Sequence, residues 1–179
     1  MNLSDPNAAP RIETKHLVLR PWRADDFEPF AAMMADAEVA RFLTVAQRPE
    51  DRAAAWREMA LFVGHWALRG YGLFAVEEKA SGAFIGRVGA WQPEGWVGLE
   101  LGWAFARQHW GRGYAFEAAH AAGAWVFATL PCDRVVSLIH NDNARSQRLA
   151  ERLGMRRSAL TLHAGMPHDI WELARADWR

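Results

Sequence analysis

The alternation of apolar and polar positions near the start of the chain predicts a β-strand over residues 11–22, with Ile12, Leu17 and Leu19 on its apolar side. Pro21 cannot donate to a strand ladder, so this segment is expected to close as an edge strand. The chain therefore begins its ordered part with extended structure.

Two helices are expected next. The first begins at Asp25 or Asp26, which can cap it, and runs to about Asp36. The second runs from Pro49 to Gly70, because proline is favoured in the first turn of a helix and glycine at its end. Helical spacing predicts one apolar stripe on this second helix, formed by Trp56, Met59, Ala60, Val63, Trp66 and Ala67.

Three antiparallel strands follow in the pattern, over residues 71–79, 83–92 and 96–105, with turn residues at 80–82 and 93–95. The third of these strands, over residues 96–105, is the most informative about a functional site. Alternation from Val97 to Phe105 places its large apolar residues on one face and leaves Glu100 on the other, among Gly98, Gly102 and Ala104. A bulge in this strand would change that assignment.

The remaining elements complete an α+β order. Residues 113–130 are rich in alanine and apolar nearly all round, which predicts a buried helix lying close to a sheet. A strand is expected at 134–140, a helix at 143–153 with Gly154 after it, and two weak strands beyond Met155. The order βααβββαβαββ predicts a single α+β domain over residues 11–179, preceded by a short disordered lead at 1–10.

Composition narrows the function classes. The 179 residues include 21 basic and 21 acidic side chains, so the chain lacks the long-range field that draws proteins to nucleic acid or to an anionic membrane. One cysteine cannot form an intramolecular disulfide, which is compatible with a cytoplasmic location. The seven histidines show no metal-ligand spacing, so no metal is expected.

The segment Gln108 to Ala115 stands where a strand is predicted to end and a helix to begin, an arrangement that directs backbone N–H groups at an anion such as a phosphate. Gly111 and Gly113 permit positive φ and close backbone approach, and Arg112 adds a positive charge. Taken alone, a Gly-x-Gly pair is explained better by a plain glycine turn into a helix than by a phosphate site.

Three separated motifs carry a family resemblance. Gln108-x-x-Gly111-x-Gly113 followed by Tyr114-Ala115 resembles the acyl-CoA signature of the GCN5-related N-acetyltransferases. The start Leu17-x-Leu19-Arg20-Pro21, the pair Asn143-x-x-Ser146, the segment Leu153-Gly154-Met155 and the element order are also similar to that family. The ribosomal-protein alanine N-acetyltransferases (RimJ/RimL-like) are the most similar branch.

This resemblance implies a mixed, mostly antiparallel central sheet flanked by helices, the acyl-CoA acyltransferase fold, with acetyl-CoA as co-substrate. It implies that the 108–115 loop binds the pyrophosphate of CoA and that the backbone around Phe105 and Ala106 pairs with pantetheine. Asn143 would contact pantetheine or merely cap its helix.

Glu100 is the candidate general base. An amine is mostly protonated at neutral pH, and a carboxylate can take its proton directly or through a water molecule. The isolation of Glu100 among glycines suits a ligand lying close, and Glu100 also matches the Glu-x-Gly-aromatic strand motif of the family. The alternative is a solvated glutamate on an exposed sheet face.

No obvious acid is available for the leaving thiolate. Many family members use a tyrosine at the position of Ala150, and this chain has only Tyr71 and Tyr114, neither of which fits. By resemblance Ser146 assists the thiolate, with water as the proton source if the serine is merely structural. Trp91 and Trp103 are candidates for walls of a substrate site, although cross-strand aromatic packing is the better explanation for either tryptophan taken singly.

The sequence thus predicts an acetyl-CoA-dependent N-acetyltransferase that works through a direct ternary complex. Its acceptor would be a primary amine, either a protein N-terminus or a small molecule, and the chain would be a monomer or a homodimer. Two other interpretations stay open. The first is a non-catalytic acyl-CoA-binding module, which the absent tyrosine suggests. The second is a nucleotide-binding regulatory domain, which only the glycine loop supports.

Overall fold

The computed structural model describes residues 9–44 and 47–179, and in these ranges the chain forms one eight-stranded sheet in the order β1-β2-β3-β4-β5-β6-β8-β7. Neighbouring strands are antiparallel except β5 and β6, which run parallel. The strands are β1 (Ile12–Glu13), β2 (Leu17–Arg20), β3 (Leu73–Glu78), β4 (Phe84–Trp91), β5 (Glu100–Phe105), β6 (Arg134–His140), β7 (Arg156–His163) and β8 (Met166–Ala174).

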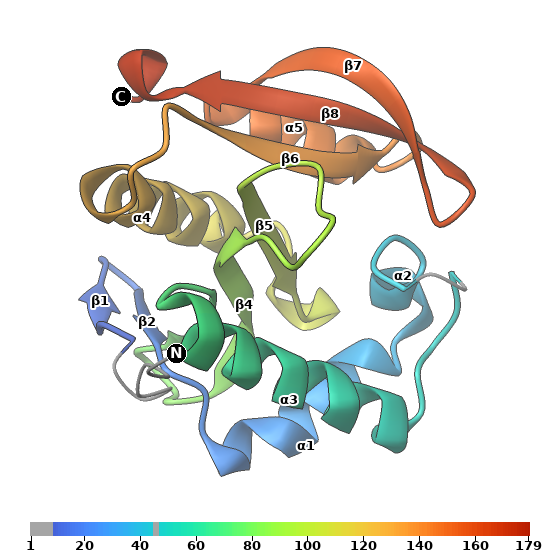
Figure 1. The fold of residues 1–179 in the computed structure, drawn as a ribbon. Helices are drawn as coiled ribbons and strands as arrows, with labels where there is room; N and C mark the ends of the chain where they lie inside the picture. The colour runs from blue at the N-terminus through green and yellow to red at the C-terminus, as the bar shows by residue number, and fades with distance from the viewer. Residues whose placement is uncertain (1–8, 45–46) are drawn as a thin grey trace.

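Helices cover both faces of this sheet, as Figure 1 shows. They are α1 (Phe27–Met34), α2 (Ala37–Ala40), α3 (Arg52–Arg69), α4 (Tyr114–Thr129) and α5 (Ala144–Arg152), with short 3-10 turns η2 (Ala24–Asp26), η3 (Arg107–His109) and η4 (Arg175–Asp177). One core cluster joins the sheet to α4 and α5, and a second joins it to α1 and α3. The predicted α+β fold with a mixed, mostly antiparallel sheet is confirmed.

The predicted edge strand over residues 11–22 is wrong in two respects. The segment forms two strands, because Thr14 turns the chain by accepting and donating bonds at Leu17. Its second half, β2, lies between β1 and β3 and is buried along its whole length, so the edge belongs to the two-residue β1. Of the predicted disordered lead, residues 1–8 lie outside the described residues, and Ala9 is buried in the core.

Both predicted N-terminal helices are present, but their starts differ from the prediction. The first is α1, with Asp26 at its N-cap position, although the Asp26 carboxylate binds the Arg20 guanidinium and the Arg23 N–H instead of bonding to the helix. The short helix α2 lies beyond the predicted end at Asp36. The second starts at Arg52, where the Asp51 carboxylate accepts from the Ala54 N–H at 2.7 Å. Its buried face is one position away from the predicted stripe, which leaves Trp56 60% exposed; that face is formed by Ala55, Phe62, His65 and Trp66.

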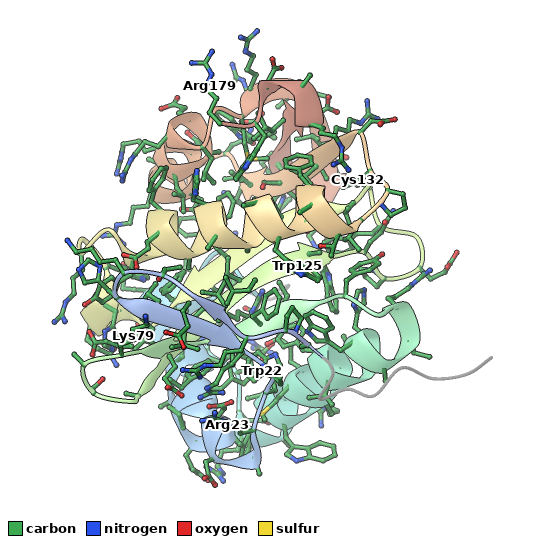
Figure 2. The ribbon with its side chains drawn as sticks, turned by 90° about the vertical axis from the view of Figure 1, so that its left-hand side faces the viewer. Trp22, Arg23, Lys79, Trp125, Cys132 and Arg179 are labelled. Carbon is green, nitrogen blue, oxygen red and sulfur yellow. The ribbon has the colours of Figure 1, made fainter. Side chains whose placement is uncertain are left out.

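The other elements lie close to their predicted bounds. The strand at 134–140 and the helices at 113–130 and 143–153 are present, with Gly113 and Asn143 as N-caps. In α4, Ala118, Ala119 and Ala122 have no exposed surface, so the helix lies directly against the sheet. Trp125, labelled in Figure 2, extends from α4 and contacts Trp66 of α3 and Phe74 of β3.

The third strand of the meander begins later than predicted. Residues 92–99 form a loop with a turn closed by the Trp96 N–H on the Pro93 carbonyl, and Val97 is 49% exposed. The strand β5 therefore starts at Glu100. Among the described residues, no helix is both long and apolar enough to cross a membrane.

Candidate functional site

The strands β5 and β6 pair only at their start. Glu100 lies opposite Val136, and the Val136 N–H donates to the Leu99 carbonyl at 2.9 Å. Beyond this point, hydrogen bonds to two side chains replace the backbone bonds between the strands. The Ser137 hydroxyl donates to the Leu101 carbonyl at 2.7 Å, and the Leu138 N–H donates to the Glu100 carboxylate at 3.3 Å. The rest of β5 has no partner strand on this side, and we call it the open edge of β5.

Backbone alternation identifies the groups on this open edge. The carbonyls of Leu99, Leu101 and Phe105 all point away from β4, since they accept from Val136, Ser137 and the Trp110 indole. The N–H and C=O of Trp103 and the N–H of Phe105 must point the same way. Not all of these groups are free, because the Phe105 carbonyl accepts a hydrogen bond from the Trp110 Nε1 at 2.7 Å. The Ala106 N–H points the other way and donates to the Ile85 carbonyl.

The loop before α4 has the geometry of an anion site. Gly111 and Gly113 have φ values of +77° and +83°, and a Cβ added at either would meet no atom within 4 Å. The first backbone bond of α4 runs from the Glu117 N–H to the Gly113 carbonyl, so the preceding first-turn N–H groups have no acceptor within the helix. The loop therefore combines unpaired backbone N–H donors with open space for an anion.

Two carboxylates, those of Glu78 and Glu117, hold this loop and the start of α4 in place. Glu78 accepts from the Tyr114 hydroxyl at 2.8 Å and lies 3.7 Å from the Arg112 guanidinium, and hydrogen bonds from Ser81 and Tyr114 hold the pKa of its carboxyl below the ordinary value. Glu117 binds the His16 N–H and ring at 2.7 Å, which ties the start of α4 to the turn between β1 and β2. These bonds hold the loop and the start of α4 in place.

A cavity of about 750 Å³ connects the loop, the open edge of β5 and α5. It brings together most of the predicted site residues: Trp103, Phe105, Gly111, Gly113, Tyr114, Ala115, Asn143 and Ser146. Ala106, Gln108, Arg112, Glu100 and Trp91 are not part of its wall. The residues of α2 and the following turn, including Val39 and Phe42, form a wall that the sequence did not suggest.

The α5 side of this cavity is basic. Arg145, Arg148 and Arg152 all line it, and no carboxylate of the described residues lies within ion-pair distance of them. The Arg145 guanidinium lies over the Trp110 ring and that of Arg152 over the Phe116 ring, each 4.4 Å from the ring centre. With Arg41 these groups outnumber Glu38 and Asp142 in the wall, so the cavity suits a polyanion.

Ser146 is part of the wall of this cavity. Its hydroxyl accepts from the Trp103 Nε1 at 3.3 Å, and its N–H donates to the Asn143 side chain at 3.2 Å, so Asn143 caps α5. At the position of the family tyrosine, Ala150 is fully buried. Tyr114 is also in the cavity wall, but its hydroxyl donates to Glu78, and this bond raises the pKa of the phenol.

Glu100 lies on the other face of the sheet. It is the cross-strand partner of Trp91, and Trp91 packs against Phe62 and His65 of α3. One carboxylate oxygen of Glu100 accepts from the Trp96 Nε1 at 2.6 Å, and the other from the Leu138 N–H. Burial raises the pKa of this carboxyl, and the two hydrogen bonds and the charge of Arg87 oppose that rise.

Further carboxylates surround Arg87 on the same face. The Arg87 guanidinium lies 3.9 Å from Glu58 and 4.8 Å from the centre of the Phe62 ring. Burial raises the pKa of both Glu58 and Glu50, and one oxygen of each is buried without a hydrogen-bond partner. This side of β4 and β5 is therefore rich in carboxylates, whereas the α5 side is rich in arginine.

The structure thus separates residues that the sequence grouped together. Trp91 and Trp103 lie on opposite faces, so they do not form one wall, and only Trp103 lines the cavity. Sequence reasoning missed two contributors: Ser137, which binds β5, and the arginines of α5. The spacing of Arg145, Arg148 and Arg152 on one helical stripe was the available signal. Among the described residues, no cluster of three or more His, Cys, Asp or Glu could hold a metal ion.

Comparisons with known proteins identify the family of this chain. Residues 16–156 match the model of the acetyltransferase (GNAT) domain, and this match covers most of the chain. The chain therefore belongs to the GNAT acetyltransferase family and is an N-acetyltransferase.

Three individual proteins illustrate the likeness. YkkB of Bacillus subtilis (strain 168) is 37% identical over 108 residues, which are 58% of this chain and 63% of YkkB. An acetyltransferase from Agrobacterium tumefaciens C58 superposes with a TM-score of 0.81 at 29% identity, covering 93% of this chain and 95% of that one. RimL, a ribosomal L7/L12 alpha-N-protein acetyltransferase solved with coenzyme A, shares the fold at 14% identity and a TM-score of 0.75, covering 92% and 98% of the two chains.

Replacing Gly113 tests the loop directly. Gly113→Val is expected to abolish measurable acetyl-CoA binding in calorimetry, because the new side chain fills the open space above the first-turn N–H groups and disfavours the φ of +83°. Gly165→Val is the matched control, since Gly165 also has positive φ and open space but lies in the turn between β7 and β8, outside the cavity wall. Equal affinities for the two variants would show that the loop does not bind the cofactor.

Proposed function

We propose that this chain transfers an acetyl group from acetyl-CoA to a primary amine by direct attack within a ternary complex. The observation that carries this proposal is the open edge of β5. It lies beside the glycine loop and Ser146 on one face of the sheet, and Glu100 lies at its start on the other. Cofactor and amine can therefore approach the same point from opposite faces.

The residues present fit an acyl-CoA molecule. The N–H groups between Gly111 and Phe116 would hold the pyrophosphate, and the arginines of α5 would balance its charge. The Trp103 carbonyl and the Phe105 N–H would pair with the amides of pantetheine, because they are the free groups of the open edge. When bound there, the thioester of acetyl-CoA supplies an activated acetyl group.

Glu100 would accept the proton of the attacking ammonium, directly or through a water molecule. A raised pKa makes the carboxylate a stronger base than an exposed glutamate, which suits this role. Trp96 would orient the carboxylate through its bond at 2.6 Å. The Trp103 N–H, the free backbone donor closest to Glu100 along the open edge, would stabilise the negative charge that develops on the thioester oxygen.

Ser146 would donate a hydrogen bond to the leaving sulfur. Trp103 already donates to the Ser146 oxygen, which leaves the hydroxyl proton free to point into the cavity. A serine is a poor acid, so its role is to stabilise the thiolate while water completes protonation.

The acceptor is a protein N-terminus or a small amine. The carboxylates around Arg87 on the Glu100 face favour an acceptor that approaches as a cation, which both classes do at neutral pH. A free-thiol release assay with acetyl-CoA, run against peptides of varied N-termini and a panel of small amines, separates them. Tight CoA binding without thiol release on any acceptor would instead favour the non-catalytic acyl-CoA-binding module.

Ser146→Ala is expected to lower kcat by about tenfold with little change in acetyl-CoA affinity, because the charge on sulfur appears only as the C–S bond breaks. Steady-state kinetics and calorimetry on the same preparation separate the two effects. If kcat is unchanged, the serine is structural and water alone serves the thiolate.

Glu100→Gln is expected to reduce kcat/KM by roughly 10² or more at pH 7, since the shape is kept and the base is lost. In the unmodified protein kcat/KM should fall as the pH decreases, with a midpoint above pH 4.5. The reason is that burial raises the pKa of Glu100, so the base becomes protonated at a higher pH than an exposed glutamate does. The deficit of the variant should shrink at high pH, where more amine is already deprotonated. Glu94→Gln, at an almost fully exposed side chain, is the control; a Glu100→Gln rate within about threefold of it would refute the role.

A further inference from the structure

The strand β7 forms a long exposed edge at one end of the sheet. It has eight residues and, within the described part of the chain, pairs only with β8, whereas β1 at the other end has two residues. In Figure 1, β7 lies at the outer limit of the sheet. Proteins usually protect such an edge with proline or charged side chains. Here the charges are confined to Arg156 and Arg157, and residues 158–162 carry none, so the edge is open to another strand.

Two leucines make this edge apolar. Leu160 and Leu162 are 72% and 73% exposed, the highest fractions among the large apolar side chains of the described residues. They lie on the α5 face of the sheet, because Leu160 is opposite Asp169, and Trp171, two residues further along β8, packs in the core cluster with α5. Thr161 lies on the other face. The leucines therefore extend the apolar face of the sheet beyond the part that α5 covers.

The hairpin geometry identifies the backbone groups of β7 that point outward. Residues 164–165 form a two-residue turn with φ values of +51° and +77°, so His163 and Met166 close the hairpin as a hydrogen-bonded pair. Because hydrogen-bonded and non-hydrogen-bonded pairs alternate in an antiparallel ladder, the N–H and C=O of Leu160 and of Leu162 point away from β8.

Pro167 agrees with this assignment. It is the cross-strand partner of Leu162 and has no N–H, and its carbonyl accepts from the Asn141 N–H at 3.3 Å on the opposite side of β8. The outward groups of Leu160 and Leu162 thus have no partner strand among the described residues.

We infer that β7 pairs antiparallel with β7 of a second copy of this chain, about a twofold axis that passes beside Thr161. In this register Leu160 lies opposite the partner's Leu162, and the outward backbone groups of the two bond to each other. Thr161 lies opposite its own copy on the other face, and threonine pairs are favourable across strands. The edge is therefore self-complementary, as a twofold interface requires. This inference does not depend on the proposed function.

Side-chain pairing and charge both favour this register. An axis at Leu160 would instead place Leu162 opposite the partner's Ser158 and lose leucine contacts. With the axis at Thr161, Arg156 and Arg157 lie four to five residues from it, so the arginines of the two protomers stay roughly 30 Å apart, beyond the range of repulsion at physiological salt. Because two paired strands bury less than the roughly 1,600 Å² of a standard interface, we expect a dimer of micromolar affinity.

Sedimentation velocity over about 1 to 300 μM tests the inference, and the unmodified protein should show a monomer–dimer equilibrium. The double variant Leu160→Lys, Leu162→Lys should stay monomeric, because each new lysine faces another across the axis. The double variant Leu160→Lys, Leu162→Glu should recover the dimer, because only the register about Thr161 places opposite charges face to face. Leu68→Lys, at a 62% exposed leucine of α3, is the control and should dimerise like the unmodified protein.

Three results would overturn the inference. The first is a monomer at every concentration of the unmodified protein, which would leave the β7 edge to a different chain. The second is a dimer that persists with both lysines or is lost in Leu68→Lys, because the interface would then lie elsewhere. The third is a monomeric Leu160→Lys, Leu162→Glu variant, which contradicts the register.

A cross-link decides the question if the charged variants do not fold. Thr161→Cys, made with Cys132→Ser so that the new thiol is the only one, should form a covalent dimer under mild oxidation. The Cα atoms of a non-hydrogen-bonded antiparallel pair are about 4.5 Å apart, which a disulfide can bridge. Ser158→Cys in the same background should not cross-link, because its partner in this register is Ala164. No cross-link at Thr161→Cys would show that the proposed pairing does not form.

Discussion

The separation of β6 from β5 directly after Val136 is the constraint on which the candidate site depends. Buried backbone groups need partners, and a strand that leaves its neighbour exposes them. Here two side chains satisfy the groups at the branch point, Ser137 at the Leu101 carbonyl and Glu100 at the Leu138 N–H. The N–H and C=O of Trp103 and the N–H of Phe105, further along the strand, face the cavity without such a substitute. The same feature thus fixes Glu100 and leaves an edge for an extended ligand.

The sheet also divides the charge of the molecule. The chain carries equal numbers of basic and acidic residues, which gives no hint of a local field. In three dimensions the arginines of α5 gather on the side of the cavity, whereas Glu50, Glu58 and Glu100 lie near Arg87 on the other side. An anionic cofactor and a cationic acceptor are therefore attracted to different faces. This arrangement agrees with the proposed attack of the amine on the thioester through the opening between β5 and β6.

Much of this could be predicted from local sequence. Caps and periodicity identified α4, α5 and β6, and glycines with positive φ identified the loop at 111–113. Alternation correctly separated Glu100 from Leu101 and Phe105 within β5. The remaining features depend on pairing between distant segments. The burial of β2 between two strands, the opposite faces of Trp91 and Trp103 and the bond from Trp96 to Glu100 all follow from cross-strand register and loop closure, which no local pattern specifies.

Amide hydrogen exchange, followed residue by residue by NMR with and without acetyl-CoA, tests the central claim most directly. The account predicts that the cofactor slows exchange at Trp103 and Phe105, whose N–H groups lie on the open edge, and leaves Gly102 and Ala104 unchanged because these pair with β4. Unchanged exchange at Trp103 and Phe105 in a saturated complex would contradict the account, because the open edge of β5 would then not be where the cofactor binds.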